Sequence, residues 1–216
     1  MRKESVRNWG VAKWARVAVM VTVAMCTSAA YSASKTVLVL GDSLSAEYGL
    51  ARGEGWVALL EQRLKDAGID ATLVNASISG ETTSGGITRL PALLSKNQPA
   101  IVVVELGAND GLRGLALGDT RKNLRNIINA AQKSNARVVL VGMQLPPNYG
   151  TDYTKRFAAI FPTLAKETKS ALVPFMLDGV VSQPLLFQAD RIHPTAQAHP
   201  IILDTIWPHL KPLLSK

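Results

Sequence analysis

Residues 36–45 read TVLVLGDSLS, an apolar and partly β-branched run that ends in a glycine, an acid and a serine. A short continuous apolar run of this kind is typical of a strand buried on both faces, as in a parallel sheet covered by helices. Gly41 allows a tight turn directly after the strand, which places the Ser43 hydroxyl at the strand's carboxyl edge. In open α/β sheets, ligands bind outside that edge. The segment therefore predicts both a parallel sheet and the edge at which chemistry is expected.

Four similar runs follow along the chain, and they predict strands over residues 71–75, 100–106, 137–142 and 172–175, in addition to 36–40. Between them, apolar residues recur at the spacing of helices that pack one face on a core. These residues are Trp56, Leu59, Leu60 and Leu64, then Leu124, Ile127, Ile128 and Ala131, then Phe157, Ile160 and Leu164. A last helix is predicted from about residue 196 to 210, after Pro194. With right-handed crossovers, this alternation predicts an α/β fold, a three-layer α/β/α sandwich around a parallel sheet of five strands.

The N-terminus has the pattern of an export signal. Residues 1–16 hold five basic side chains and one acid, and residues 17–34 hold no charge. An apolar stretch over residues 17–25 is followed by the small residues Ser28, Ala29, Ala30, Ser32 and Ala33. This order predicts a cleaved signal peptide over residues 1–33, cut between residues 30 and 34, and one exported domain over residues 34–216, periplasmic or secreted.

Two other interpretations of the N-terminus fit the sequence less well. An uncleaved membrane anchor needs about 20 apolar residues, whereas this run is shorter and contains Thr and Ser. A lipoprotein signal at Cys26 is weaker still, because Met25 stands where such signals place a small residue.

Composition narrows the class of protein. The 216 residues are 47% hydrophobic and 19% charged, which suits one domain with a sizeable core. Cys26 is the chain's one cysteine and lies in the predicted signal, so the mature protein is expected to have no disulfide and no thiol redox chemistry. The formal charge is +8, of which residues 1–33 supply +4. The remaining +4 is a mild basicity that does not indicate nucleic-acid binding.

Polar residues follow the other predicted strands at the same edge. Gly80 lies in a small-residue loop after the second strand, Asn109 follows the third, and Asp190 and His193 follow the fifth. Each signal is weak alone, because such residues are common in turns and caps. Together they supply a nucleophile in Ser43, a base in His193 and an orienting carboxylate in Asp190. The backbone N–H groups of Ser43 and Gly80 and the side-chain amide of Asn109 are then expected to form an oxyanion hole.

The same blocks resemble the SGNH, or GDSL, hydrolase family. They read GDSLSAEYGL from Gly41, SGETTSGG from Ser79, ELGANDGLRG from Glu105 and DRIHPT from Asp190, and a further block reads LPPNYG from Leu145. The resemblance spans nearly the whole mature chain and is closest to the bacterial branch of multifunctional thioesterases, lysophospholipases and arylesterases. It implies a small, exported, cofactor-free enzyme of flavodoxin-like topology that cleaves carboxylic ester and thioester bonds through an acyl-enzyme on Ser43.

The motifs also depart from two patterns. The resemblance implies Gly and Asn at positions 191 and 195, where this chain has Arg191 and Thr195. The Gly-x-Ser-x-Gly elbow of α/β-hydrolases is absent, because position 45 is Ser, and this disfavours that fold.

The substrate class is less well specified. Two loops at the expected edge offer an apolar lining that favours acyl chains, with membrane lipids as one source, and its residues are Leu112, Leu115, Leu117, Leu145, Pro146, Pro147 and Tyr149. Tyr48 and Tyr149 are further candidates for ligand contact, whereas Trp56 is expected in the core. A carbohydrate or peptidoglycan O-acetyl esterase remains an alternative. So does a catalytically silent acyl-binding module, although the intact Ser43, Asp190 and His193 argue against it.

No cofactor or metal is expected, and the protein is expected to act as a monomer. A metal set of Asp190, His193 and His199 lacks the His-x-x-x-His pairing and a third ligand cluster. The glycines at residues 85–86 belong to neither dinucleotide- nor phosphate-binding motif.

Overall fold

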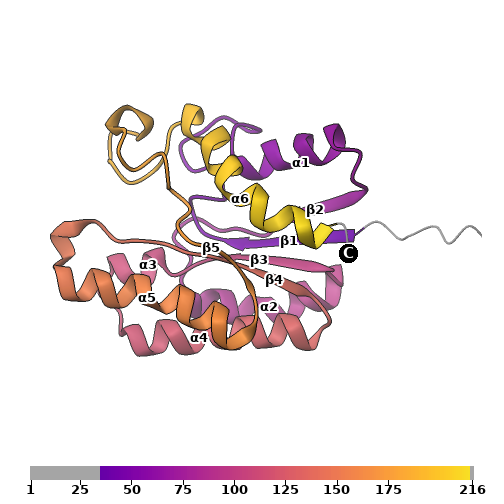
Figure 1. Cartoon of the computed structure of the whole chain (residues 1–216), viewed down its shortest axis with the longest axis horizontal. Helices are drawn as coiled ribbons and strands as arrows, with labels where there is room; N and C mark the ends of the chain where they lie inside the picture. Colours follow the sequence, from indigo (N-terminus) through magenta and orange to yellow (C-terminus); the bar gives the residue numbers. More distant parts are fainter. Residues whose placement is uncertain (1–34, 215–216) are drawn as a thin grey trace, which may run out of the picture. The chain divides into compact units, whose positions relative to one another are not determined.

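The computed structural model describes residues 35–214. Its sheet has five strands, all parallel, in the order β2-β1-β3-β4-β5 (Figure 1). The strands are β1 (Lys35–Gly41), β2 (Ala71–Asn75), β3 (Ile101–Glu105), β4 (Arg137–Val141) and β5 (Ala171–Val173). The predicted five-stranded parallel sheet and its flavodoxin-like order are therefore confirmed.

The predicted fifth strand, 172–175, was too long. It ends at Val173 because Pro174 has no N–H to donate to a neighbouring strand. The last α-helix begins later than the predicted residue 196. Residues 196–198 form a 3₁₀ turn, η3 (Ala196–Ala198), and the α-helix α6 (His199–Leu214) begins after it.

Helices cover both faces of the sheet, which makes the three predicted layers. On one face lie α1 (Trp56–Asp66) and α6, and on the other lie α2 (Thr83–Asn97), α4 (Leu117–Lys133) and α5 (Thr151–Thr168) (Figure 1). The short helix α3 (Ala108–Leu112) directly follows β3. Two short 3₁₀ turns, η1 (Pro147–Tyr149) and η2 (Pro184–Leu186), lie in the loops after β4 and β5.

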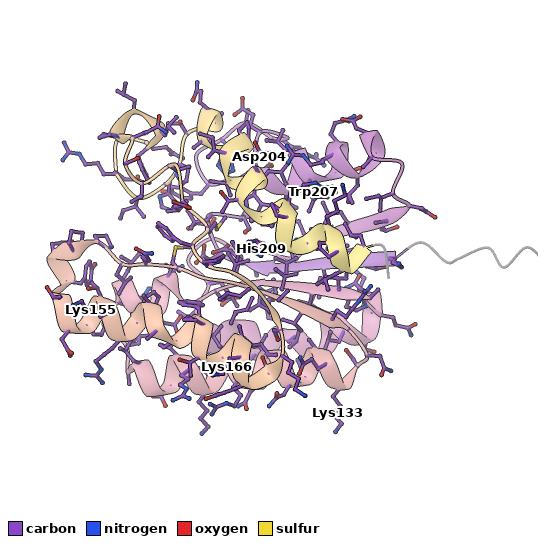
Figure 2. The ribbon with its side chains drawn as sticks, in the orientation of Figure 1. Lys133, Lys155, Lys166, Asp204, Trp207 and His209 are labelled. Carbon is purple, nitrogen blue, oxygen red and sulfur yellow. The ribbon has the colours of Figure 1, made fainter. Side chains whose placement is uncertain are left out.

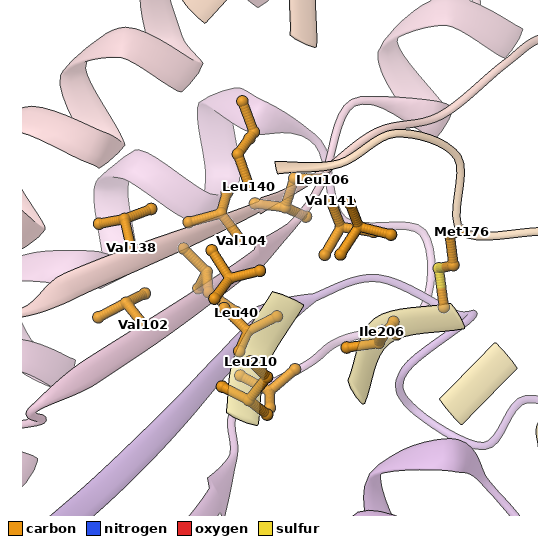
Figure 3. Close-up of a cluster of buried hydrophobic side chains, with 14 of the residues drawn as sticks. Leu40, Val102, Val104, Leu106, Val138, Leu140, Val141, Met176, Ile206 and Leu210 are labelled. Carbon is orange, nitrogen blue, oxygen red and sulfur yellow. The ribbon is translucent and has the colours of Figure 1, made fainter. Parts of the chain in front are cut away.

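The core lies on both sides of the central strands. All five residues of β3 are buried, as the unbroken apolar run at 101–104 predicts. Figure 3 shows side chains of β1, β3 and β4 in a buried cluster that also includes Ile206 and Leu210 of α6. Trp56 of α1 is fully buried, so the prediction that it belongs to the core is confirmed.

Charged residues lie on the outer faces of the helices. Lys133, Lys155 and Lys166 are exposed on α4 and α5 (Figure 2). Arg63 of α1 binds Asp204 of α6 at 2.6 Å, and its guanidinium lies 5.9 Å from the centre of the Trp207 ring. Figure 2 labels Asp204 and Trp207 on α6. Within residues 35–214, no helix combines the length and apolar character that a membrane span needs. The predicted signal peptide lies outside the described residues.

The order of the strands positions the site. The chain passes from β1 to β2 on one side and then returns to β3 on the other side of β1. The crevice between the carboxyl ends of β1 and β3 is therefore a topological switch point, where α/β proteins bind ligands. Ser43 follows β1 and Asn109 follows β3, so both lie at this crevice.

Candidate active site

A single tight turn presents Ser43 at the end of β1. The carbonyl of Asp42 accepts the N–H groups of Ser45 at 3.2 Å and Ala46 at 3.0 Å. Its carboxylate oxygen Oδ1 also accepts the N–H of Leu44 at 3.1 Å, as Asp side chains do in turns. These bonds close the backbone around Ser43, whose side chain is half-buried at the carboxyl edge of the sheet.

Ser43, His193 and Asp190 form one chain of hydrogen bonds. Nε2 of His193 lies 2.9 Å from Oγ of Ser43, and Nδ1 of His193 lies 2.6 Å from Oδ2 of Asp190. The first contact joins residues 150 positions apart in sequence. This is the geometry in which a histidine removes the proton from a serine while a carboxylate fixes the histidine tautomer.

Asp190 is held as an ionised carboxylate by its own loop. Its Oδ1 accepts the backbone N–H groups of Ile192 at 2.9 Å and His193 at 3.0 Å. Desolvation acts to raise the pKa of Asp190, but the hydrogen bonds from the His193 backbone and ring and from Ile192 outweigh it and lower this pKa to about 2. The carboxylate is therefore charged at neutral pH and lies where it can stabilise an imidazolium formed during a reaction.

Tyr48 packs on the imidazole of His193. The two ring centroids are 4.2 Å apart and the ring planes are tilted by 35°. Nε2 of Gln188 donates to the carbonyls of Tyr48 and Pro194, each at 2.9 Å, and so joins the loop after β1 to the loop after β5. The sequence marked Tyr48 only as a possible ligand contact, whereas the structure shows it supporting the ring of His193.

The loop after β2 brings Gly80 to the same edge. The N–H of Ile78 donates to the carbonyl of Gly41 at 3.1 Å, which ties this loop to the end of β1. Gly80 has φ +79°, a left-handed conformation that glycine adopts without steric cost. Its carbonyl accepts Nη2 of Arg113 at 2.9 Å.

Asn109 stands in the first turn of α3, directly after β3. Gly107, with φ +115°, bends the chain into this helix. Nδ2 of Asn109 donates to Oδ2 of Asp42 at 3.1 Å, so the amide lies beside the turn that carries Ser43. The next residue, Asp110, is buried and accepts both the N–H and the hydroxyl of Thr83, which docks the start of α2 on the same loop.

The predicted apolar lining is divided between surface and core. Leu115 and Tyr149 are 44% and 37% exposed, Pro146 and Pro147 are exposed, and Leu112 and Leu117 are half-buried. Leu145 is only 7% exposed and belongs to the hydrophobic core, because it packs against Gly111 of α3. The hydroxyl of Tyr149 donates to the carbonyl of Leu112 at 3.1 Å and so joins the two loops.

Some features of this edge were not found from the sequence. Ile78 and Ile192 are exposed beside Gly80 and His193, at 48% and 45%. Arg191 has φ +58°, the conformation for which glycine is favoured, at the position where the family resemblance implies Gly. Asp42 and Glu105 are buried together beneath Ser43, and the alternation of apolar and polar residues gave no signal for either.

His199 has a structural position. Its Nδ1 accepts the backbone N–H of Trp56 at 2.9 Å, at the start of α1. Burial lowers the pKa of His199, which favours the neutral ring that this bond requires.

Comparisons with known proteins agree with the geometry. A profile of the GDSL-like lipase/acylhydrolase family matches residues 39–201. Esterase TesA of Pseudomonas aeruginosa is 51% identical over 183 residues, which cover 85% of this chain and 91% of that protein. The Escherichia coli K12 protein named thioesterase 1/protease 1/lysophospholipase L1 is 44% identical over 184 residues, which cover 85% and 87%. A crystal structure of the psychrotrophic esterase EstA from Pseudoalteromonas, inhibited by monoethylphosphonate, has TM-score 0.80 and 41% identity and covers 84% of this chain and 100% of that one. The resemblance predicted from the sequence is confirmed, and the chain belongs to the GDSL-like lipase/acylhydrolase family.

Proposed function

We propose that the protein is a serine hydrolase that cleaves carboxylic ester and thioester bonds of acyl substrates through an acyl-enzyme on Ser43. The observation that carries this proposal is the unbroken chain of hydrogen bonds from Asp190 through His193 to Ser43. Family membership and the names esterase, thioesterase and lysophospholipase among its relatives support it.

His193 transfers the proton in each half of the reaction. Nε2 of His193 takes the proton of the Ser43 hydroxyl as Oγ attacks the acyl carbonyl, and the imidazolium then gives the proton to the leaving alkoxide or thiolate. Asp190 accepts the Nδ1–H and stabilises the imidazolium through its negative charge. Water, activated by the same ring, then attacks the acyl-enzyme and releases the acid.

The oxyanion of each tetrahedral intermediate is proposed to bind the backbone N–H groups of Ser43 and Gly80 and the side-chain amide of Asn109. The amide nitrogen of Asn109 carries two hydrogens. One of them donates a hydrogen bond to Asp42, and the second is free to donate to the oxyanion. The short turns at Ser43 and Gly80 bring backbone N–H groups to the same crevice. Loss of one such donor typically lowers kcat by about 10²- to 10³-fold.

The apolar side chains at the mouth favour acyl chains over small acetyl groups. Leu115 and Tyr149 are exposed beside the Asn109 loop, and Pro146 and Pro147 continue the same surface. Leu145 is buried beneath this lining and supports it from the core. Lipid-derived esters and thioesters are therefore the proposed substrate class, with a monomer as the active unit because one chain supplies every proposed site residue.

Export is proposed from the N-terminal pattern alone. Five basic residues, an apolar run and small residues over 1–33 support a cleaved signal peptide and a periplasmic or secreted mature chain. N-terminal sequencing of the protein recovered from the periplasmic fraction tests this. The first residue is expected between positions 31 and 34, whereas an intact Met1 contradicts cleavage.

Two measurements test the enzymatic proposal. A reactive alkyl phosphonate is expected to form one covalent adduct, located by peptide mass spectrometry on Ser43. Steady-state hydrolysis of chromogenic esters from acetyl to palmitoyl is expected to peak at medium or long chains. Activity confined to acetyl esters would instead support a carbohydrate or peptidoglycan O-acetyl esterase. An adduct on another residue, or no hydrolysis of any ester, contradicts the proposal.

A further inference from the structure

Two carboxyl groups lie buried directly beneath the Ser43 turn. Asp42 precedes Ser43, and Glu105 is the last residue of β3, and each is only 1% exposed. The register of the sheet places Glu105 opposite Gly41. The neighbours of Glu105 in the chain, Val104 and Leu106, lie in the apolar core (Figure 3). Burying a carboxyl group among apolar residues destabilises the fold unless hydrogen bonds offset the loss of its hydration.

Glu105 accepts hydrogen bonds from the residues on both sides of the Ser43–Leu44 pair. Its Oε2 accepts the N–H of Asp42 at 3.1 Å and the hydroxyl of Ser45 at 2.7 Å. The Ser45 hydroxyl in turn accepts the indole N–H of Trp56 at 3.1 Å. The carboxyl group therefore connects the turn of the nucleophile to β3 and to α1.

Asp42 connects that turn to Asn109. One carboxylate oxygen accepts the N–H of Leu44, and the other accepts Nδ2 of Asn109 at 3.1 Å. Because the amide group is planar, a fixed acceptor for one N–H also fixes the direction of the other. Asp42 thus sets the direction of the N–H that Asn109 offers to the crevice.

Burial and mutual repulsion oppose the ionisation of the two carboxyl groups. Burial raises the pKa of Glu105 well above its usual range, and the negative charge of Asp42 raises it further. Burial also raises the pKa of Asp42, to about 6, against the lowering effects of its hydrogen bonds from Leu44 and Asn109 and of the nearby His193. Of the two groups, Glu105 is therefore the one whose environment more strongly favours the neutral form. Oε1 of Glu105 has no hydrogen-bond partner among the described residues, which a neutral acid tolerates better than a carboxylate does.

We propose that Asp42 and Glu105 are positioning residues for the oxyanion hole: Glu105 fixes the Ser43 turn, and Asp42 aims the Asn109 amide at the developing oxyanion. This rests on the oxyanion role of Asn109 in the proposed function. The charge of Asp42 acts against an oxyanion nearby, but the same charge stabilises the imidazolium of His193 formed in the same step. The oriented and polarised N–H of Asn109 is the gain specific to the transition state.

A double-mutant cycle in kcat tests the link between Asp42 and Asn109. Asn109→Ala is expected to lower kcat by about 10²- to 10³-fold. Asp42→Asn removes the charge and leaves one acceptor oxygen in place of the two that bind Leu44 and Asn109, so the side chain can no longer accept both hydrogen bonds. This variant is expected to lower kcat by about 10-fold or more with little change in KM. In the double variant, Asp42→Asn is expected to add almost nothing to the loss from Asn109→Ala. If the fold-loss in the double variant equals the product of the two single fold-losses, the two residues act independently and the proposal is overturned.

A matched control is Asp110→Asn. Asp110 is also buried, but its carboxylate binds Thr83 and not the Asn109 side chain, so its coupling to Asn109→Ala is expected to be clearly weaker than that of Asp42→Asn. Equal coupling for both aspartates would make the Asp42 link non-specific and overturn the proposal. If Asn109→Ala itself leaves kcat unchanged, the oxyanion role of Asn109 in the proposed function fails too. Two independent losses would instead overturn only the link between Asp42 and Asn109.

Rescue tests the neutral form of Glu105. Glu105→Ala is expected to lower kcat, and Glu105→Gln is expected to recover most of the loss, because a Gln carbonyl accepts the same two hydrogen bonds without charge. Equal losses in both variants contradict a neutral carboxyl group.

A measurement that leaves Asp42 intact covers the case in which its variants do not fold. The side-chain amide of Asn109 is observed by ¹⁵N NMR in His193→Ala protein and assigned by its disappearance in Asn109→Ala. Its signals are expected to titrate with the Asp42 carboxyl, with a midpoint at or above about pH 6, because the variant lacks the His193 ring that lowers the pKa of Asp42 in the wild-type protein. Signals that do not change between pH 4 and pH 8 overturn the link between the two side chains.

Discussion

Gly41 and Glu105 approach each other so closely that position 41 has no room for a side chain. A Cβ atom on Gly41 would lie 2.8 Å from Oε2 of Glu105 and 2.8 Å from both Cβ and Oγ of Ser45. Real Cβ atoms do not approach other atoms so closely, so either the carboxyl group or the nucleophile turn would have to shift. The first glycine of the motif is therefore required by the buried carboxyl beneath it.

Gly41→Ala is accordingly expected to lower the free energy of unfolding by about 1–3 kcal/mol, the usual cost of overpacking, and to lower kcat. Gly118→Ala is the matched control, because Gly118 lies in α4 with nothing within 4 Å of an added Cβ. In that variant the free energy of unfolding is expected to rise by about 0.5 kcal/mol, because Ala favours the helix more than Gly does. Urea denaturation of the two variants checks both signs. A loss of the same size at both positions contradicts the close contact.

Tyr48→Ala is expected to lower kcat about two- to fivefold, because the ring lies on the His193 imidazole and stabilises its cationic form by about 0.5–1 kcal/mol. Tyr48→Phe keeps the ring and is expected to keep kcat within about twofold. The measurement is kcat on a short-chain ester, whose acyl group is too small to depend on Tyr48 for binding. An equal loss in the Phe variant would assign the effect to the hydroxyl and contradict ring packing as its cause.

The pH dependence of stability is expected to show the raised pKa of Asp42. This pKa moves from the ordinary value of 3.8 to about 6 in the folded state. Between these values the unfolded chain loses the proton that the folded chain keeps, so this contribution to stability is full below pH 3.8 and lost as pH rises through about 6. Glu105, also raised, adds a contribution of the same sign.

Urea denaturation between pH 4 and pH 7 measures this contribution. In the wild-type protein the component due to Asp42 is expected to fall with rising pH, and in Asp42→Asn that component is expected to be absent. An identical pH dependence in the two proteins would mean that Asp42 ionises in the folded state at its ordinary pKa.

The apolar mouth is expected to set acyl-chain preference. Leu115→Ala and Tyr149→Ala remove exposed apolar surface beside Asn109 and are expected to lower the ratio of kcat/KM for long-chain to acetyl esters about 10-fold, as for one or two buried methylene groups. Leu59→Ala, on the α1 face away from this edge, serves as the control and should keep the ratio. An unchanged ratio in all three variants would remove these loops from substrate binding.

The sheet could be predicted because its signal is local. The apolar runs at 101–104 and 138–141 are long enough to exclude half-buried strands, and both became central strands. Helix α2 (Thr83–Asn97) was not predicted, since it contains Gly85, Gly86 and Pro91, which disfavour helix in isolation. Gly86 is buried against Leu106, so a close contact made only in the folded protein selects glycine there.

Site residues could be predicted where the chain order and the strand edges place them. Ser43, Gly80, Asn109, Asp190 and His193 each follow a strand, and the parallel sheet brings such positions to one edge. The roles of Asp42, Glu105 and Tyr48 depend on side-chain contacts across the sheet, which no local pattern encodes. The position of Leu145 in a loop at this edge predicts a lining residue, but its side chain is buried in the core.

The most direct test of the account is kcat for hydrolysis of a medium-chain ester by three proteins: wild type, Ser43→Ala and Ser79→Ala. Ser79 is an exposed serine in the neighbouring loop after β2 and controls for the loss of a hydroxyl at this edge. Ser43→Ala is expected to lose about 10⁶-fold in kcat, as when the nucleophile of a catalytic triad is removed, while Ser79→Ala stays near wild type. Substantial hydrolysis by Ser43→Ala would contradict the assignment of Ser43 as the nucleophile.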